Sequence, residues 1–260
     1  MDETGETQVS LTDADARSMA TTARMPRIVG YNVQTAVEAD HHLIVTHEVT
    51  MLGFDRDALS MMAAAANDVM TTDQLTAIAD KGYYKGEEIV ASEDAGISVV
   101  VPKPMTSNAA ARGQFDRADF AYDRDLDVYL CPAGETLTYR FTGQQDGKAI
   151  RSYWSGACAK CPIKTKCTTS KERRVRRWEH EHVLEKVQER LDEDPNQLAV
   201  RSMTVEHPYG TIKSWMGATH FKMRRLKNVA TEMALHVLAY NMTRVMKIMG
   251  IPAMIAAMKA

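Results

Sequence analysis

Two acidic side chains and one lysine in this sequence have the spacing expected of a metal-dependent catalytic site. Glu206 and Lys213 stand seven positions apart, which is about two turns of an α-helix, so both side chains would share one face. Asp80 directly follows the apolar run 75–79, at the kind of strand end where open sheets place functional groups. Together they predict a site that holds a divalent cation against a phosphodiester.

Each of these residues also has a structural explanation. An Asp followed by Lys81 and Gly82 is typical of a turn. Glu206 and Pro208 are both favoured in the first turn of a helix, and Lys213 would then be a solvated cation on that helix. The adjacent His207 is a candidate substrate contact by position alone. Spacing does not separate these alternatives.

The cysteines form a second candidate metal site. Cys158 and Cys161 make a Cys-x2-Cys knuckle, and Cys131 and Cys167 flank it. Four thiolates close a tetrahedral zinc site and leave no open position, so such a zinc ion would be structural. The alternative is a small domain with reduced, partly buried cysteines, because the outer spacings are irregular.

Basic residues gather in two segments. The first holds a run of cations between Trp154 and Trp178: Lys164, Lys166, Lys171, Arg173, Arg174, Arg176 and Arg177. The second contains Lys222, Arg224, Arg225 and Lys227. Such runs are usually solvated faces, but two of them on either side of Glu206 favour contact with a nucleic-acid backbone.

The composition is that of an ordinary globular protein. The chain has 260 residues, 45% of them hydrophobic and 25% charged, with a net charge of −2, which argues against a uniformly basic nucleic-acid wrapper. It shows no membrane-spanning run and no secretory start, so we expect a cytoplasmic protein with reduced thiols and no membrane partner.

Hydrophobic periodicity predicts alternating strands and helices. Strands are expected at 28–37, 43–49, 75–79 and 97–102, and helices at 55–70 and 87–95, the latter stopped by Gly96. Further helices are expected at 179–192, 205–216 and 229–249. We therefore predict an α/β core, a mixed sheet flanked by helices, from residues 27–104 and 180–250. Residues 105–179 would form a small, β-rich inserted subdomain that holds the cysteines, and residues 1–26 a polar lead-in.

Several segments, read in order, resemble the catalytic region of a DDE-type transposase of a bacterial insertion sequence. They are TDADARSM at 12–19, GYNVQTAV at 30–37, ADKGY at 79–83, the cysteine segment, TVEHPYGTIK at 204–213 and LAYN at 238–241. Each is weak alone, but their order is specific and spans nearly the whole chain.

The resemblance implies an RNase H-like fold with an insertion before the last catalytic helix. It implies DNA cleavage at element ends and strand transfer to a target, with DNA as partner and a homo-oligomer as the active form. In that family three carboxylates hold two Mg²⁺ (or Mn²⁺) ions. Asp80 matches the second acid, Glu206 the third, and Lys213 a lysine that contacts DNA phosphate.

Two departures from the family pattern bear on activity. The family's first acid lies on a strand upstream of Gly30, and this chain holds no match to it; Asp13 and Asp15 match a different segment. Relatives carry an arginine four residues before the Glu, where this chain has Ser202 next to Arg201. The sequence thus predicts an N-terminally truncated transposase with impaired activity. The alternatives are a non-catalytic DNA-binding or regulatory remnant, or a product with no function beyond residual folding.

Overall fold

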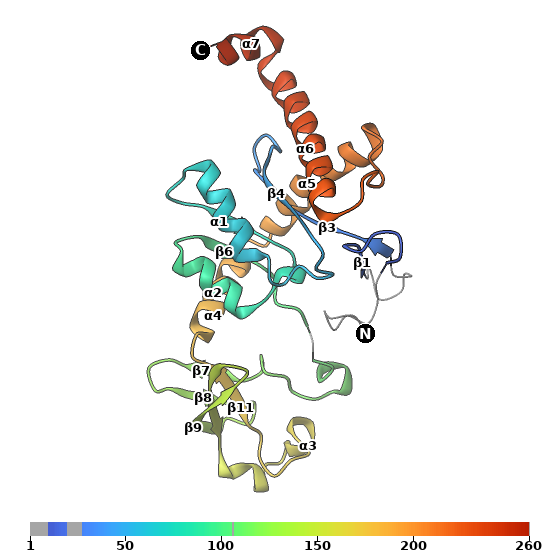
Figure 1. The fold of residues 1–260 in the computed structure, drawn as a ribbon. Helices are drawn as coiled ribbons and strands as arrows, with labels where there is room; N and C mark the ends of the chain where they lie inside the picture. Colours follow the sequence, from blue (N-terminus) through green and yellow to red (C-terminus); the bar gives the residue numbers. More distant parts are fainter. Residues whose placement is uncertain (1–9, 20–27, 106, 260) are drawn as a thin grey trace. The chain divides into compact units, whose positions relative to one another are not determined.

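The computed structural model describes residues 10–19, 28–105 and 107–259. The chain forms two compact units (Figure 1). The first unit comprises Met1–Lys103 and Lys186–Ala260, and the second Pro104–Glu185. We had predicted an inserted subdomain at 105–179.

The first unit is a mixed α/β structure. Its helices are α1 (Leu59–Met70), α2 (Gly86–Asp94), α5 (Gln197–Gly210), α6 (Leu226–Met249) and α7 (Ile251–Lys259), and α4 (Glu181–Glu193) enters it from the second unit. Its strands are β1 (Arg17–Met19), β2 (Ile28–Gly30), β3 (Asn32–Val37), β4 (Ile44–Thr50), β5 (Thr76–Ile78) and β6 (Ser98–Val100).

The strands of this unit pair in twos. Antiparallel ladders join β1 to β2 and β3 to β4, while β5 and β6 are parallel. Among the described residues β3 bonds only to β4, and β5 only to β6. Among the described residues, the predicted mixed sheet is therefore present as separate two-stranded ladders, since no described strand bridges β3 and β5.

Helix α1 shows how the local sequence sets an element. Its residues Leu59, Met62, Ala63 and Ala66 recur at helical spacing and are all buried. It ends where Thr71 adopts φ 47°, and the Thr71 amide donates to the Asn67 carbonyl at 2.9 Å. Gly96, the predicted stop after α2, has φ 79°.

The hydrophobic core of the first unit lies between β4 and α6. It contains Ile44, Val49 and Ile212 together with four α6 residues: Val229, Met233, Val237 and Tyr240. The Asn241 side chain fixes this contact, because its amide donates to the Ile44 carbonyl at 2.8 Å and its oxygen accepts the Ile44 amide at 3.0 Å.

The described residues of the predicted lead-in fix the start of α6. Residues 17–19 pair with β2, and Asp15 accepts the Leu226 amide at 2.9 Å. Asp13 accepts the Arg225 amide at 3.2 Å and the Tyr31 hydroxyl at 2.7 Å. Two acids at a helix N-terminus accept hydrogen bonds from its free amides, and their negative charge interacts favourably with the helix dipole. These aspartates therefore have a structural role. The rest of the lead-in, residues 1–9 and 20–26, lies outside the described residues.

Helix α5 begins earlier than predicted. We expected a helix from about residue 205 because Pro208 fits a first turn, but α5 starts at Gln197 and contains Pro208. After Gly210 the chain continues as a π-helical segment, Thr211–Trp215, in which the Met216 amide bonds five residues back to Thr211. Pro208 is buried, so tertiary packing outweighs its local cost.

The second unit is built on one antiparallel sheet. Its strands are β7 (Ala121–Asp123), β8 (Val128–Leu130), β9 (Thr136–Gln145), β10 (Lys148–Trp154) and β11 (Val175–Trp178), in the order β11-β10-β9-β8-β7, and the short α3 is Lys164–Cys167. Its core contains Phe120, Tyr129, Leu137, Tyr153 and Val175. No helix of the described chain is both long and apolar enough to cross a membrane.

Candidate acidic site and basic surfaces

Asp80 lies just after β5, where the sequence predicted an acidic side chain. Its Oδ1 accepts the Gly82 amide at 2.7 Å, so the residue caps the following turn of 3-10 helix. Its Oδ2 lies 3.1 Å from the Arg201 guanidinium of α5. Asp80 is therefore both a turn residue and a half-exposed carboxylate that faces a cation.

A second carboxylate, Asp55, lies at the same place. Its Oδ1 accepts the side-chain amides of Asn32 and Gln34, both at 2.7 Å. A Cβ built on Gly82 would lie 2.9 Å from Asp80 Oδ1 and 3.6 Å from Asp55 Oδ2, so both carboxylates lie close to the side of Gly82 where a side chain would be. A side chain at position 82 would press on the Asp80 carboxylate.

An open pocket of about 410 Å³ exposes these groups. It is lined by Asp55, Asp80, Lys81, Gly82, Pro102, Leu198 and Arg201. Sequence reasoning missed Asp55. The available signal was the alternation of Asn32 and Gln34 on β3, which places two polar side chains on one face of the strand, where they require a hydrogen-bond partner. Carboxylate oxygens suit Mg²⁺, but here Arg201 supplies the positive charge beside Asp80.

Tyr83 connects the acids to β3. Its hydroxyl donates to Gln34 Oε1, and Gln34 in turn donates to Asp55. Burial raises the pKa of Tyr83, and the nearby Asp55 and Asp80 carboxylates raise it further. The phenol therefore remains neutral and acts as a donor that orients the Asp55 network.

The structure does not bring Glu206 and Lys213 into this pocket. Glu206 is exposed and accepts the Ser202 hydroxyl at 2.7 Å, on the same side of α5 as Ser202. Lys213 lies in the π-helical segment, with its Nζ 5.5 Å from the centre of the Tyr209 ring. The wider π winding breaks the 3.6-residue repeat, so the same-face argument for Glu206 and Lys213 does not hold here. Arg201, rather than Glu206, is the α5 residue that reaches Asp80.

His207 packs against other residues of the first unit. Its Nδ1 lies 2.9 Å from the Tyr240 hydroxyl, which itself donates to the His42 carbonyl at 2.7 Å. Since that hydroxyl has one hydrogen, His207 Nδ1 must be the donor in their contact. Burial lowers the pKa of His207, as do the nearby Arg244 and His42. The contacts favour a packing role over a catalytic one.

The first basic segment divides into two faces. Along β11, Arg176 is exposed while Val175 and Arg177 are buried, as strand alternation requires, and Arg174, directly before the strand, is exposed as well. Arg174 and the neighbouring Arg140 both lie over the Trp154 ring, at 4.9 and 5.6 Å. Lys171 is exposed too, and Arg173 is half-buried against Phe120.

Arg177, one of the predicted DNA contacts, differs from the exposed arginines in its surroundings. It is 6% exposed, pairs with Glu185 through both terminal nitrogens, and lies 3.7 Å above the Tyr122 ring. Burial by itself would lower the pKa of Arg177, but its contacts with Glu185 and Tyr129 together outweigh burial and raise that pKa. A guanidinium held in this way stabilises the second unit.

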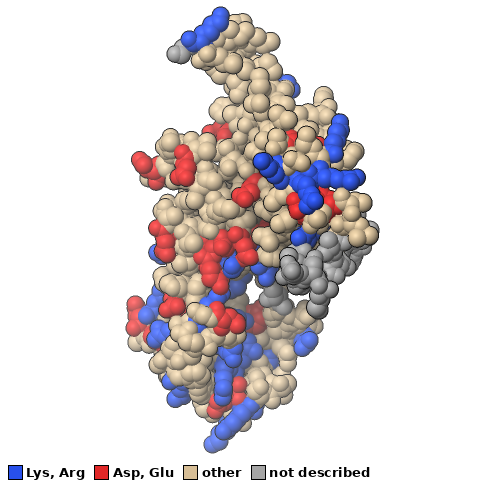
Figure 2. All heavy atoms as spheres, viewed as in Figure 1, with Lys and Arg blue, Asp and Glu red and all other residues tan. Residues whose placement is uncertain are grey.

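The second basic segment is an exposed loop before α6. Lys222, Arg224 and Arg225 are all exposed there. The α6 carboxylate Glu232 holds the loop by accepting the amides of Lys222 at 2.9 Å and Met223 at 2.9 Å. Figure 2 shows groups of Lys and Arg on both units, interspersed with acids. The exposed basic residues form local patches that are suited to an anionic backbone.

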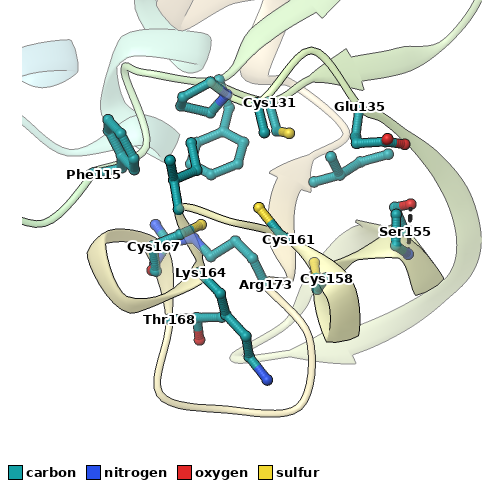
Figure 3. Close-up of a pocket in the computed structure, with 16 residues that line it drawn as sticks. Phe115, Cys131, Glu135, Ser155, Cys158, Cys161, Lys164, Cys167, Thr168 and Arg173 are labelled. Carbon is teal, nitrogen blue, oxygen red and sulfur yellow. Dashed lines mark hydrogen bonds between the residues drawn. The ribbon is translucent and has the colours of Figure 1, made fainter.

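The four cysteines line one small pocket in the second unit. Figure 3 shows their sulfur atoms around this pocket, with Cys158 on the short helical turn Gly156–Lys160, Cys161 directly after that turn, and Cys167 on α3. All four are free and half-buried, and burial raises the pKa of Cys167, as do the other three thiols. Within the described residues, no three His, Cys, Asp or Glu side chains stand together as a ready metal site. Neither the zinc nor the magnesium prediction is confirmed.

Comparison with known proteins finds one family model that matches part of the chain. Residues 130–246 match the family model of the transposase DDE domain. This match supports a DDE-type transposase. It includes all four cysteines, the exposed basic residues, Glu206 and Lys213, while Asp55 and Asp80 of this candidate transposase lie before it. Searches of curated proteins and of solved structures found no match.

Proposed function

We propose that the protein is a transposase of a bacterial insertion sequence, which cleaves and joins DNA through metal-dependent phosphodiester chemistry. The match of residues 130–246 to the transposase DDE domain carries this proposal. An RNase H-like arrangement of the first unit belongs to the proposal. DNA is then the partner, the active form is a homo-oligomer that pairs two ends, and the location is cytoplasmic.

In this proposal Asp80, Asp55 and Glu206 are the candidate ligands of Mg²⁺ or Mn²⁺, and Lys213 is a candidate phosphate contact. The pocket around Gly82 supports the first two, because both carboxylates face it. A bound metal ion would activate the attacking oxygen and neutralise charge on the phosphate. Arg201 would have to leave Asp80 for that carboxylate to bind a metal ion directly.

We also propose that activity in this chain is low. Arg201 forms an ion pair with Asp80, where a metal ion would otherwise supply the positive charge. Glu206 accepts a hydrogen bond from Ser202 and does not line the pocket. These two contacts favour the second candidate function, a DNA-binding or regulatory remnant that uses the exposed basic residues. The two functions share DNA binding and differ in cleavage.

A supercoiled-plasmid nicking assay with Mg²⁺ or Mn²⁺ separates them. We expect weak nicking that Asp80→Ala and Glu206→Ala both abolish, while the exposed control Asp73→Ala leaves it unchanged. DNA binding is measured in parallel by fluorescence anisotropy. Binding without nicking supports the remnant. Loss of both, in a protein that folds normally, overturns a function on DNA.

We propose further that Cys131, Cys158, Cys161 and Cys167 bind a structural zinc ion. Their shared pocket supports this proposal. Zn–S bonds are about 2.3 Å long, so all four sulfurs would lie at about that distance from one ion. Cys158 of the short turn Gly156–Lys160 and Cys167 of α3 would be two of its ligands.

A further inference from the structure

One buried N–H group in the cysteine pocket has no hydrogen-bond partner. The Arg173 side chain lines this pocket together with the four cysteines, and Figure 3 shows it extending toward Cys167. Its Nη1 donates to the Cys167 carbonyl at 3.4 Å, and its Cζ lies 5.2 Å from the centre of the Phe120 ring. Its Nε is buried, and no group of the described residues accepts a hydrogen bond from it. The guanidinium is therefore held in place with one donor unused.

The guanidinium of Arg173 also lacks an opposite charge. An arginine side chain stays protonated in proteins, and no carboxylate of the described chain pairs with this one. Much of the pocket wall is apolar, with Phe115, Phe120 and Leu137 among its residues. A charge in such surroundings is costly unless an opposite charge lies beside it. The pocket is thus suited to a group with net negative charge.

The zinc site proposed above supplies such a charge. Four cysteine thiolates around one Zn²⁺ ion carry a net charge of about −2. A thiolate bound to a metal ion has lost its proton, so it accepts charge-assisted hydrogen bonds from nearby cationic donors. Arg173 is such a donor, and it already contacts one of the four cysteines through the carbonyl of Cys167.

We propose that Arg173 is a positioning residue of this zinc site: its Nε–H donates to the Cys167 thiolate while its Nη1 holds the carbonyl of the same residue. Cys167 ends the four-residue helix α3, which gives its side chain little support. A donor behind a metal ligand fixes the orientation of that ligand and stabilises its charged form. This role rests on the proposed zinc site, and it assigns Arg173 to the pocket rather than to a DNA phosphate.

A buried water molecule is the alternative partner for Nε. The pocket volume of about 30 Å³ exceeds the roughly 10–15 Å³ that one water molecule needs. Water would accept the N–H group but would leave the guanidinium without an opposite charge. The two arrangements differ in one measurable respect, because only a thiolate partner makes the effect of Arg173 depend on zinc.

Zinc affinity and thermal unfolding of the whole chain separate these arrangements. Arg173→Gln removes the charge, and Arg173→Lys keeps a charge but has no Nε. Arg174→Gln is the matched control, because Arg174 is the exposed neighbour and lies over the Trp154 ring. We expect competition with a chelator to show about 10–100-fold weaker zinc binding in both Arg173 variants, the usual effect of losing a group that supports a metal ligand. Arg174→Gln should bind zinc as the unchanged protein does.

The thermal midpoint gives a second readout. Zinc that binds only the folded chain stabilises it according to its affinity, so Arg173→Gln should lower the midpoint of the zinc-loaded form more than that of the zinc-free form. A purely structural role would lower both midpoints equally.

Cobalt gives a spectroscopic readout on the same variants. Co²⁺ bound by four thiolates absorbs through thiolate-to-cobalt charge transfer, and hydrogen bonds to the sulfurs change the energy of these bands. We expect the bands to shift in both Arg173 variants and to stay in place in Arg174→Gln.

Three results would overturn this role. Unchanged zinc affinity in Arg173→Gln, or midpoints lowered equally with and without zinc, would favour water at Nε and leave the zinc site intact. An unchanged protein that binds neither Zn²⁺ nor Co²⁺ would overturn the zinc site and this role together. If no Arg173 variant folds, NMR of the arginine Nε–H groups in the unchanged protein decides the question. One such resonance should move when zinc is added, and resonances that all stay in place would overturn the proposal.

Discussion

At the scale of single residues, one carboxylate, Asp127, accepts hydrogen bonds from three side chains of the second unit. Asp127 adopts φ 52° in the turn between β7 and β8 and accepts the hydroxyls of Tyr122 and Tyr153, both at 2.7 Å. Arg151 donates to its other oxygen at 2.5 Å. One carboxylate thereby satisfies the hydroxyl of Tyr153, which is fully buried.

Asp127→Asn should destabilise the second unit by about 1.5–3 kcal/mol, the usual range for hydrogen bonds to a charged group. Asn tolerates the positive φ, so the loss reports the charge and not the turn. Urea denaturation with the exposed control Asp125→Asn measures it. An equal effect in both variants would contradict a specific role for Asp127.

Among the basic residues, we expect the exposed ones to contact DNA and the buried Arg177, which pairs with Glu185, to stabilise the fold. We expect Arg174→Ala with Arg176→Ala to weaken DNA binding and to lower the slope of log K against log salt by about two, because each lost phosphate contact releases about one counterion fewer. Arg177→Ala should leave the slope unchanged and lower stability. An unchanged slope in the double variant would remove β11 from the DNA interface.

At the scale of elements, carboxylates fix the loop that carries the second basic segment. Burial by itself would raise the pKa of Glu232, but the amides of Lys222 and Met223 outweigh it and lower that pKa. A carboxyl with a lowered folded-state pKa contributes stability above its ordinary value of 4.5, and this contribution is lost as pH falls through the folded value.

We therefore expect the free energy of unfolding to decline below about pH 4.5, and Glu232→Gln to flatten that decline. Denaturation curves across this range test it, with the exposed Glu48→Gln as the matched control. A pH profile that is the same in both variants would show that the loop does not depend on the Glu232 charge.

Zinc binding by the four cysteines is also a prediction about a structural element. Protein grown with zinc should contain about one zinc ion, as a four-thiolate structural site holds one. Cys161→Ser should lose it, and a chelator should lower the thermal midpoint of the unchanged protein. Thr168→Ala, which lines the same pocket without a thiol, should keep the metal. Metal-free protein with an unchanged midpoint would favour reduced cysteines.

At the scale of the whole molecule, the pairing of strands is a feature that hydrophobic periodicity does not predict. Hydrophobic periodicity anticipated α1, the β3–β4 hairpin, the apolar segments of β5 and β6, and a β-rich segment with the cysteines. It did not reveal that, among the described residues, β3 pairs only with β4 and β5 only with β6, because pairing between distant strands leaves no mark on either strand alone. The family match and the ordered motifs agree on a DDE-type transposase.

The sequence by itself determined which segments are helical or extended, since spacing of apolar side chains and turn residues act locally. It also determined that Asp80 follows a strand. Only the tertiary structure decided which charges meet, because partners such as Asp80 and Arg201 come from distant segments. It placed Asp55 beside Asp80, turned Glu206 away, and buried Arg177. Those outcomes depend on tertiary packing and on the π-helical segment after Gly210. The spacing of residues along the sequence predicts neither of them.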